Sequence, residues 1–174
     1  MIYDFKNHVP KIASGCFVAP SAHIIGNTAI SEGSSVWFGA VIRADLNAVK
    51  IGKNVSVQDN CVIHTDRNTP VEIADDVVIG HNAIVHSAKV GSNCIIGMGA
   101  ILLSGSKIGS NCIIAAGAVV SEGSEIPDNS IAAGVPARVI KPVTQEHIKR
   151  IKNNVLEYAE LNAAWFTGQG RQLQ

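Results

Sequence analysis

The stretch "VGSNCIIGMGAILLSGSKIGSNCIIAAGAVVSEGSEI" at residues 90–126 carries an aliphatic residue at every sixth position. The series is Val90, Ile96, Leu102, Ile108, Ile114, Val120 and Ile126. A period of six fits neither the 3.6-residue period of an amphipathic helix nor the two-residue period of a plain strand. The stretch therefore predicts a structure built from internal repeats.

The same six-residue step occurs over most of the preceding chain, at residues 12–42, 51–63 and 73–85. A small residue follows most of these aliphatic anchors by four positions, and glycine often follows an anchor directly. A coil of three short strands explains the pattern, because the anchor points inward on each flat face and the small residue fills the tight space near each corner. Successive coils then lie about 4.8 Å apart and bond as a parallel sheet does.

The bulk composition sets limits on the class of protein. A chain of 174 residues with 47% hydrophobic residues can bury one good core, and with 5% aromatics that core is aliphatic. Fourteen basic and fourteen acidic residues argue against nucleic acid or a membrane surface as the main partner. No long apolar segment marks a leader or a membrane span. We expect a soluble, cytoplasmic protein.

The four cysteines share one position in the repeat. Each occupies the small inward slot, and they are Cys16, Cys61, Cys94 and Cys112. This placement favours core packing over a redox or metal role. Cys94 and Cys112 lie one coil apart, close enough for a disulfide in geometric terms, but the cytosol would keep them reduced.

Three histidines have positions in the repeat that suggest a shared ion. His64 and His86 directly follow anchors on the same face, one coil apart, so they are predicted to point outward and stack. Two imidazoles placed in this way can bind one ion at roughly 2.0–2.1 Å. His81 lies at a corner beyond a neighbouring face and cannot easily reach that pair within one chain. In a trimer the corner of one subunit meets the face of the next, and His81 would complete the site there.

The repeat loses its phase beside these histidines. Nine residues separate Ile42 from Ile51 and ten separate Ile63 from Ile73, which predicts bulging loops at "RADLNAV" (43–49) and "HTDRNTPVE" (64–72). Stacking places Arg43 one coil before His64, and Asp59 one coil before His81 with Gln58 beside it. The plainest interpretation of the charged residues in this region, which are Arg43, Asp45 and Asp59, is a set of salt bridges between subunits.

The hexapeptide repeat over about residues 12–140 resembles the hexapeptide-repeat family, which implies an all-β, left-handed parallel β-helix and a homotrimer. Within that family the sequence closely resembles the γ-class carbonic anhydrases and their bacterial and archaeal homologues. The matching pieces are "RAD" at 43–45, "VQDNCVIHT" at 57–65, "GHNAIVH" at 80–86 and "IGMGA" at 96–100.

The resemblance implies specific roles for the residues in those pieces. The metal ligands would be His64, His81 and His86. The interface ion-pair network would be Arg43, Asp45 and Asp59, with Arg43 also holding the site in shape for catalysis, and Gln58 would bond the metal-bound water. The cofactor would be one divalent metal per site, with zinc favoured and iron or cobalt as alternatives. The remaining histidines, which are His8, His23 and His147, are interpreted as ordinary surface or core residues.

The chemistry implied is the reversible hydration of carbon dioxide to bicarbonate. Three imidazole ligands leave one coordination position open, and a divalent metal lowers the pKa of water bound there from 15.7 to roughly 7. The sequence departs from the best-known γ-class enzyme where that enzyme transfers protons, because Leu46 follows Asp45 and the 64–73 loop is short. Asp66 and Glu72 are the only acids nearby, so the level of activity is left open.

We expect a left-handed β-helix domain at residues 1–142 and a C-terminal helix with a loose tail at 143–174. Thr144 is the predicted N-cap, and Glu146 lies in the first turn. A predicted apolar stripe packs on the coil or on the neighbouring subunit and comprises Ile148, Ile151, Val155, Tyr158 and Leu161. Tyr158 has two interpretations, as part of the core or as an aromatic that reaches the metal pocket as in the family.

Two rival functions stay open on the same scaffold. One is a hexapeptide acyltransferase that uses a single histidine as general base, with coenzyme A in the groove between subunits. The other is a metal-dependent acyl-coenzyme A thioesterase or an assembly protein. Three histidines placed for one ion argue against the acyltransferase, which needs only one.

Overall fold

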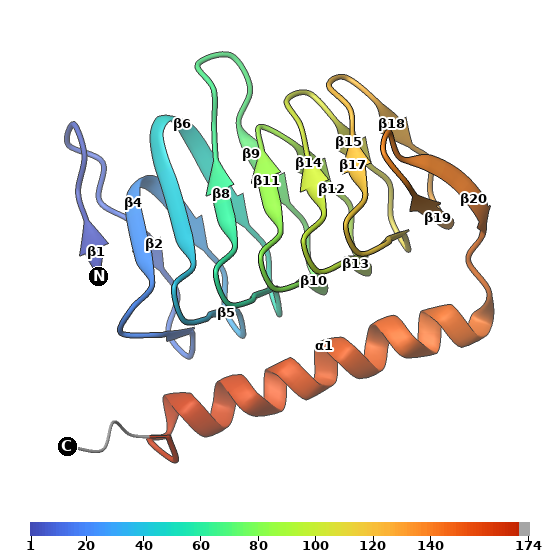
Figure 1. Cartoon of the computed structure of the whole chain (residues 1–174). Coiled ribbons are helices and arrows are strands. Elements are labelled where there is room, and N and C mark those ends of the chain that lie inside the picture. The colour runs from blue at the N-terminus through green and yellow to red at the C-terminus, as the bar shows by residue number, and fades with distance from the viewer. Residues whose placement is uncertain (171–174) are drawn as a thin grey trace.

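The six-residue step folds as a coil of short parallel strands in a computed structural model that describes residues 1–170 (Figure 1). The coil is a left-handed parallel β-helix, and one C-terminal helix, α1 (Gln145–Phe166), lies along its side. No helix within residues 1–170 combines the length and the hydropathy needed to cross a membrane. The predicted fold class is confirmed.

Three faces form the coil, and we number them one, two and three in the order in which the chain visits them from Ile12. Face one contains β2 (Lys11–Ile12), β9 (Val71–Ile73), β12 (Lys89–Val90), β15 (Lys107–Ile108) and β18 (Glu125–Ile126). Face two contains β3 (Phe17–Val18), β5 (Ser35–Val36), β7 (Ser56–Val57), β10 (Val77–Ile79), β13 (Cys94–Ile96), β16 (Ile113–Ile114), β19 (Ser130–Ala133) and the antiparallel β20 (Arg138–Pro142). Face three contains β8 (Val62–His64), β11 (Ile84–His86), β14 (Ile101–Leu102) and β17 (Val119–Val120).

The remaining strands lie at the N-terminal end of the coil. Both β4 (His23–Ile30) and β6 (Val41–Ile51) run without a break from face three to face one, and β1 (Ile2–Tyr3) pairs with β4. The prediction of a bulging loop at residues 43–49 is wrong, because the residues beyond the six-residue step lengthen β6 instead. The register shift between Gly26 and Thr28 of β4 accommodates the difference in length. Gly26 has φ +74°, and a Cβ there would collide with the carbonyl oxygen of Ala44, so this position requires glycine.

The second predicted loop is present. β8 ends at His64 and β9 begins at Val71, so residues 65–70 leave the coil between them as the tallest excursion in Figure 1. The Asp66 carboxylate holds the loop by accepting hydrogen bonds from the backbone N–H groups of Asn68 and Thr69.

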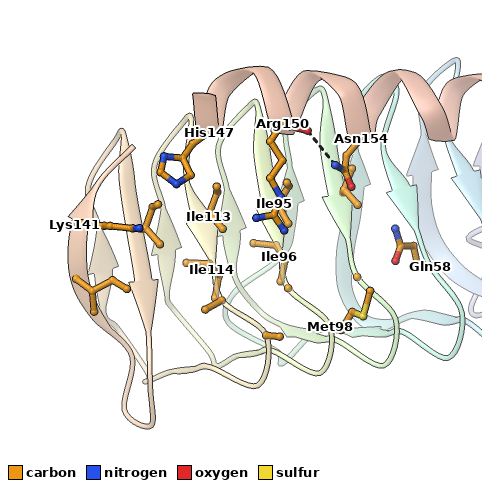
Figure 2. A pocket seen from close by; sticks show the side chains of 17 residues that line it. Gln58, Ile95, Ile96, Met98, Ile113, Ile114, Lys141, His147, Arg150 and Asn154 are labelled. Carbon is orange, nitrogen blue, oxygen red and sulfur yellow. Dashed lines mark hydrogen bonds between the residues drawn. The ribbon is translucent and has the colours of Figure 1, made fainter. Parts of the chain in front are cut away.

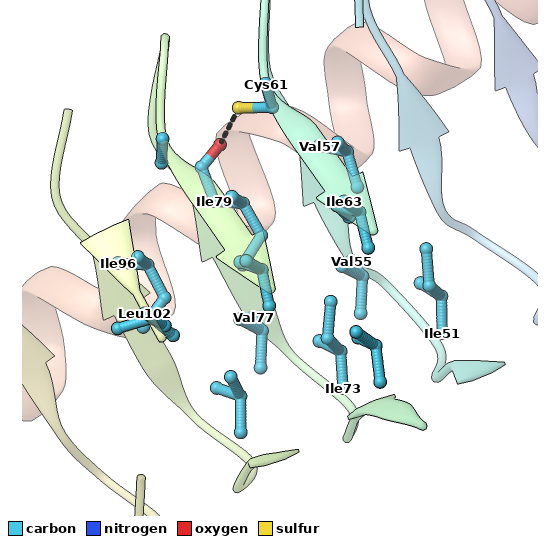
Figure 3. Packing of buried hydrophobic residues seen from close by; sticks show 14 of the residues in the cluster. Ile51, Val55, Val57, Cys61, Ile63, Ile73, Val77, Ile79, Ile96 and Leu102 are labelled. Carbon is cyan, nitrogen blue, oxygen red and sulfur yellow. Dashed lines mark hydrogen bonds between the residues drawn. The ribbon is translucent and has the colours of Figure 1, made fainter. Parts of the chain in front are cut away.

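The aliphatic anchors form the core, as the repeat predicted. Every anchor from Ile24 to Ile126 is at most 5% exposed, and Figure 3 shows Ile63 of β8, Ile79 of β10 and Ile96 of β13 pointing into the coil. All four cysteines lie within the described residues and are free thiols. Burial raises the pKa of Cys61 to about 12, so this thiol is unreactive at neutral pH. These observations support the packing interpretation of the cysteines.

Helix α1 begins at the predicted cap and turns back along the coil toward its N-terminal end (Figure 1). The Thr144 side chain accepts a hydrogen bond from the His147 backbone N–H, and the His147 ring accepts one from the Thr144 backbone N–H. This capping box gives His147 a structural role, while Glu146 lies in the first turn as expected.

The inward face of α1 differs from the prediction at one position. Ile151 and Val155 are buried and Tyr158 packs against the core, but Leu161 is 39% exposed and the inward position is Asn162. The Asn162 side chain accepts a hydrogen bond from the Phe17 backbone N–H at 2.7 Å and donates one to the Gly15 carbonyl at 2.9 Å. Thr167 caps the helix; residues 171–174, the end of the tail predicted to be loose, lie outside the described residues.

Candidate metal site

His64 and His86 lie side by side on adjacent coils of face three. Their backbones pair directly in the sheet, and Nδ1 of His64 is 3.3 Å from Nε2 of His86. Two nitrogens that each lie about 2.05 Å from one tetrahedral ion are about 3.3 Å apart. The spacing of the pair is therefore that of two ligands to one metal.

The outer nitrogen of each imidazole is held by an oxygen. Nε2 of His64 is 3.0 Å from Oδ1 of Asp45, and Nδ1 of His86 is 2.9 Å from Oγ of Ser104. Metal-binding histidines commonly have such a partner, because it orients the ring and fixes the tautomer. The sequence analysis missed Ser104. Its position could have indicated the contact, because Ser104 follows Leu102, the anchor on the coil after that of His86, by two residues.

Asp45 bridges this pair to Arg43, which precedes His64 in the ladder as predicted. Arg43 donates a hydrogen bond to the Asp45 carboxylate at 2.5 Å. Burial raises the pKa of Asp45, but the hydrogen bonds from Arg43 and His64 outweigh it and hold that pKa below its ordinary value. Asp45 is thus a carboxylate at neutral pH that orients His64 and is itself held by Arg43.

His81 lies at the corner between β10 and β11, apart from the other two histidines. Its Nδ1 is 2.8 Å from Oδ2 of Asp59, and its backbone N–H donates to Oε1 of the buried Gln58. The ring is about one-third exposed, and no hydrogen bond within residues 1–170 engages its Nε2. His81 thus resembles His64 and His86: an oxygen holds one ring nitrogen, and the other nitrogen is available to bind a ligand.

A single chain brings these residues together as two separate groups. Among residues 1–170, no cluster of three His, Cys, Asp or Glu side chains could hold a metal ion. One group is His64 and His86 with Asp45 and Ser104; the other is His81 with Asp59 and Gln58. Neutral imidazoles whose second nitrogen is hydrogen-bonded suit a divalent ion such as zinc. The donor set fits a metal only if a second chain joins the two groups.

The outward residues of face three form an uncovered aliphatic ladder beside the histidine pair. We call this ladder the aliphatic stripe; its members pair in register and are Val41, Val62, Ile84, Ile101 and Val119. Val62 is 38% exposed and the other four are half-buried. Contiguous exposed apolar surface is typical of sites that contact another molecule.

Tyr158 packs as a core residue at the side of the coil that carries His81. Its ring meets that of Trp37 edge-on, with centroids 5.7 Å apart. Burial raises the pKa of Tyr158, and the negative charge of Asp59 raises it further, so the phenol keeps its proton at neutral pH. The packing role of Tyr158 is observed, and its catalytic role stays a prediction.

Comparison with known proteins places this geometry in a family. The model "Bacterial transferase hexapeptide (six repeats)" matches residues 87–122. The chain is 45% identical to a carbonic anhydrase of Geobacillus kaustophilus, over 92% of this chain and 88% of that protein. It is 38% identical to gamma carbonic anhydrase 1, mitochondrial, of Arabidopsis thaliana, over 89% of this chain but 58% of that longer protein.

A solved structure from Bacillus cereus, described as a putative acetyltransferase, superposes with a TM-score of 0.95 at 41% identity and covers 96% of this chain and 97% of that one. The chain thus resembles proteins described by two activities, and it does so at similar identity and over nearly the whole length of each. The chain belongs to the γ-class carbonic anhydrase-like family of hexapeptide-repeat proteins.

Proposed function

We propose that this protein catalyses the reversible hydration of carbon dioxide to bicarbonate at a metal site shared between the subunits of a homotrimer. The observation that carries the proposal is the 3.3 Å approach of the His64 and His86 nitrogens, together with a third imidazole that the same chain holds apart from them. The metal is zinc, with iron or cobalt as alternatives. When bound, such a metal makes water nucleophilic near neutral pH.

The residues around the site orient the imidazole rings and supply a hydrogen-bond donor to the substrate. Asp45 and Ser104 fix the rings of one group, and Asp59 fixes His81 in the other. Since Oε1 of Gln58 already accepts from the His81 backbone, its amide NH₂ group is the part free to donate to an oxygen of the substrate. Arg43 keeps Asp45 in place, so that the imidazole geometry exists before substrate arrives.

The aliphatic stripe supports the assembly that this site requires. It lies directly beside the Arg43–His64–His86 ladder, so a second chain that covers it would also approach the histidine pair. A corner that meets a face is a heterologous contact, and three such contacts close into a ring. The chain that covers the stripe is proposed to supply His81.

Proton export is the weak step of the proposed reaction. Burial raises the pKa of Asp66, but hydrogen bonds from the Thr69 and Asn68 backbones hold it below its usual value. The Lys89 ammonium likewise lowers the pKa of Glu72, with which it pairs on face one. Both carboxylates are poor proton acceptors at neutral pH, so turnover should rise with added imidazole buffer.

The test is subunit complementation. His81→Ala and His64→Ala chains should each be inactive as homotrimers after loading with zinc. Mixed trimers should regain activity, because the first chain supplies His64 and His86 and the second supplies His81. Random mixing of equal amounts completes about a quarter of the sites. Carbon dioxide hydration, followed by stopped-flow with and without chelator, measures the recovery.

Two outcomes would contradict the proposal. Absence of recovery in verified mixed trimers would show that the site does not span subunits. Wild-type protein with a full complement of zinc, iron or cobalt but no hydration above background, at any buffer concentration, would exclude the anhydrase. Acyl-coenzyme A substrates would then be tried, since a hexapeptide acyltransferase or a metal-dependent thioesterase is the alternative on this scaffold.

A further inference from the structure

A groove of about 440 Å³ lies between helix α1 and face two, toward the C-terminal end of the coil (Figure 2). Its volume falls within the range of roughly 300–1,000 Å³ typical of small-molecule sites. One end is bordered by Lys141 of β20, and the other by Gln58 and Met98. The groove is distinct from the His64/His86 pair, neither member of which lines it.

The floor of the groove is aliphatic. Ile95, Ile113 and Ile131 stack in register as outward residues of face two. Helix α1 covers part of this ladder, so that Ile113 is 9% exposed, and the groove is the part left open along the helix. A hydrocarbon chain laid along this floor would remove apolar surface of both partners from water.

The rim of the groove carries two cations. Arg150 projects from α1 over the floor and Lys141 faces it from β20 (Figure 2). His147, whose Nδ1 accepts from the Thr144 N–H, lies beside them. The lining includes no Asp or Glu, and within residues 1–170 neither Arg150 nor Lys141 forms an ion pair. The groove therefore presents uncompensated positive charge beside an apolar floor.

We propose that this groove binds an organic carboxylate with an unbranched aliphatic chain. The carboxylate accepts hydrogen bonds from Arg150 and Lys141, and the chain lies on Ile95 and Ile113. The volume suits a single small molecule and is too small for a helix or an extended peptide of several residues. No metal ligand lines the groove, and Gln58 is the one lining residue that the proposed metal chemistry also uses.

The test is titration of the full-length, metal-free protein with hexanoate, octanoate and decanoate by isothermal calorimetry. We expect one site per chain and an affinity that rises by up to about fourfold for each added CH₂ group. Arg150→Gln and Lys141→Gln should each weaken decanoate binding by about tenfold, the loss expected for one charge-assisted hydrogen bond. Decylammonium, which has the same chain and the opposite charge, should not bind.

Lys152→Gln is the matched control, since it removes one positive charge from an exposed position of the same helix that does not line the groove. It should change decanoate affinity by less than about twofold. Ile95→Ser should flatten the dependence on chain length, with circular dichroism confirming the fold. Equal binding by wild type and Arg150→Gln, an equal loss in Lys152→Gln, or equal binding of decylammonium would each overturn the proposal.

Discussion

Faces one and three of the coil share one backbone and differ only in what they present outward. Successive outward residues of face one are charged, and they are Lys50, Glu72, Lys89, Lys107 and Glu125. The corresponding residues of face three form the aliphatic stripe. Because the inward anchors are aliphatic on both faces, the core does not distinguish them. The outward residues alone distinguish the two faces, and in the proposed trimer they leave face one in solvent and place face three against a partner.

Face two shows what covering an aliphatic face looks like in this molecule. Its outward ladder of Val78, Ile95 and Ile113 is as apolar as the aliphatic stripe, and α1 packs along it. The chain therefore covers one apolar face with its own helix and leaves the other open. The open one is the face that carries His64 and His86.

The largest effect is expected for Ile84→Asp, which places a charge in the middle of the aliphatic stripe and tests whether face three is an interface. Burying an unpaired carboxylate costs several kcal/mol, and every interface of a symmetric assembly would carry the penalty. We expect the variant to sediment as a folded monomer in analytical ultracentrifugation and to lose stoichiometric metal. The matched change on face one, Lys89→Gln, should leave the assembly intact. An Ile84→Asp variant with unchanged mass would show that the stripe is not an interface.

Face two should respond differently, because its cover belongs to the same chain. Ile151→Ala removes a fully buried side chain between α1 and the coil and should lower the free energy of unfolding by about 2–5 kcal/mol. The loss should be independent of protein concentration in urea titrations. Leu156→Ala, at an exposed position of the same helix, should change stability by less than about 0.5 kcal/mol. A loss for Ile151→Ala that varied with concentration would contradict intrachain cover.

His81→Ala is expected to weaken metal binding without changing the stability of the coil. Loss of a ligand should weaken zinc binding by more than the roughly 10–100-fold that loss of a ligand's hydrogen-bonding partner costs. The thermal melt of the metal-free protein should not move, since the side chain at this corner is partly exposed and adds little to the core. His8→Ala is the control for removal of an exposed histidine. Zinc affinity that His81→Ala leaves unchanged would remove His81 from the site.

The smallest effect belongs to the charged face. Glu72→Gln breaks the pair with Lys89 and should cost less than about 1 kcal/mol at pH 7, because the pair is solvated. Lys89 lowers the pKa of Glu72 in the folded state. The contribution of this pair to the free energy of unfolding is therefore present above the ordinary glutamate pKa, and it is lost as the pH falls through the lowered pKa of Glu72. Urea titrations of both proteins should converge once the pH is below that lowered pKa. A difference that grew in acid would contradict this sign.

The sequence predicted the coil because the six-residue step constrains every inward position at once. It also located the histidines, since stacking on a face follows from counting anchors. It failed at residues 43–49, where extra residues can leave as a loop or lengthen a strand, and Gly26 on the neighbouring coil decides between them. It failed at Leu161 because the inward position is taken by a polar residue, Asn162, which forms hydrogen bonds with backbone groups of Gly15 and Phe17. The sequence gives no sign that these two backbone groups need a partner.

Contact between Asn162 and Phe17 joins parts of the chain that are 145 residues apart. Coils contact only their neighbours, so a bare solenoid behaves as a one-dimensional array that can fray from either end. Helix α1 turns back along that array and packs Trp165 against Phe17 on the first coils. Helix α1 thereby clamps the first coils, and unfolding of the N-terminal coils becomes coupled to release of the helix.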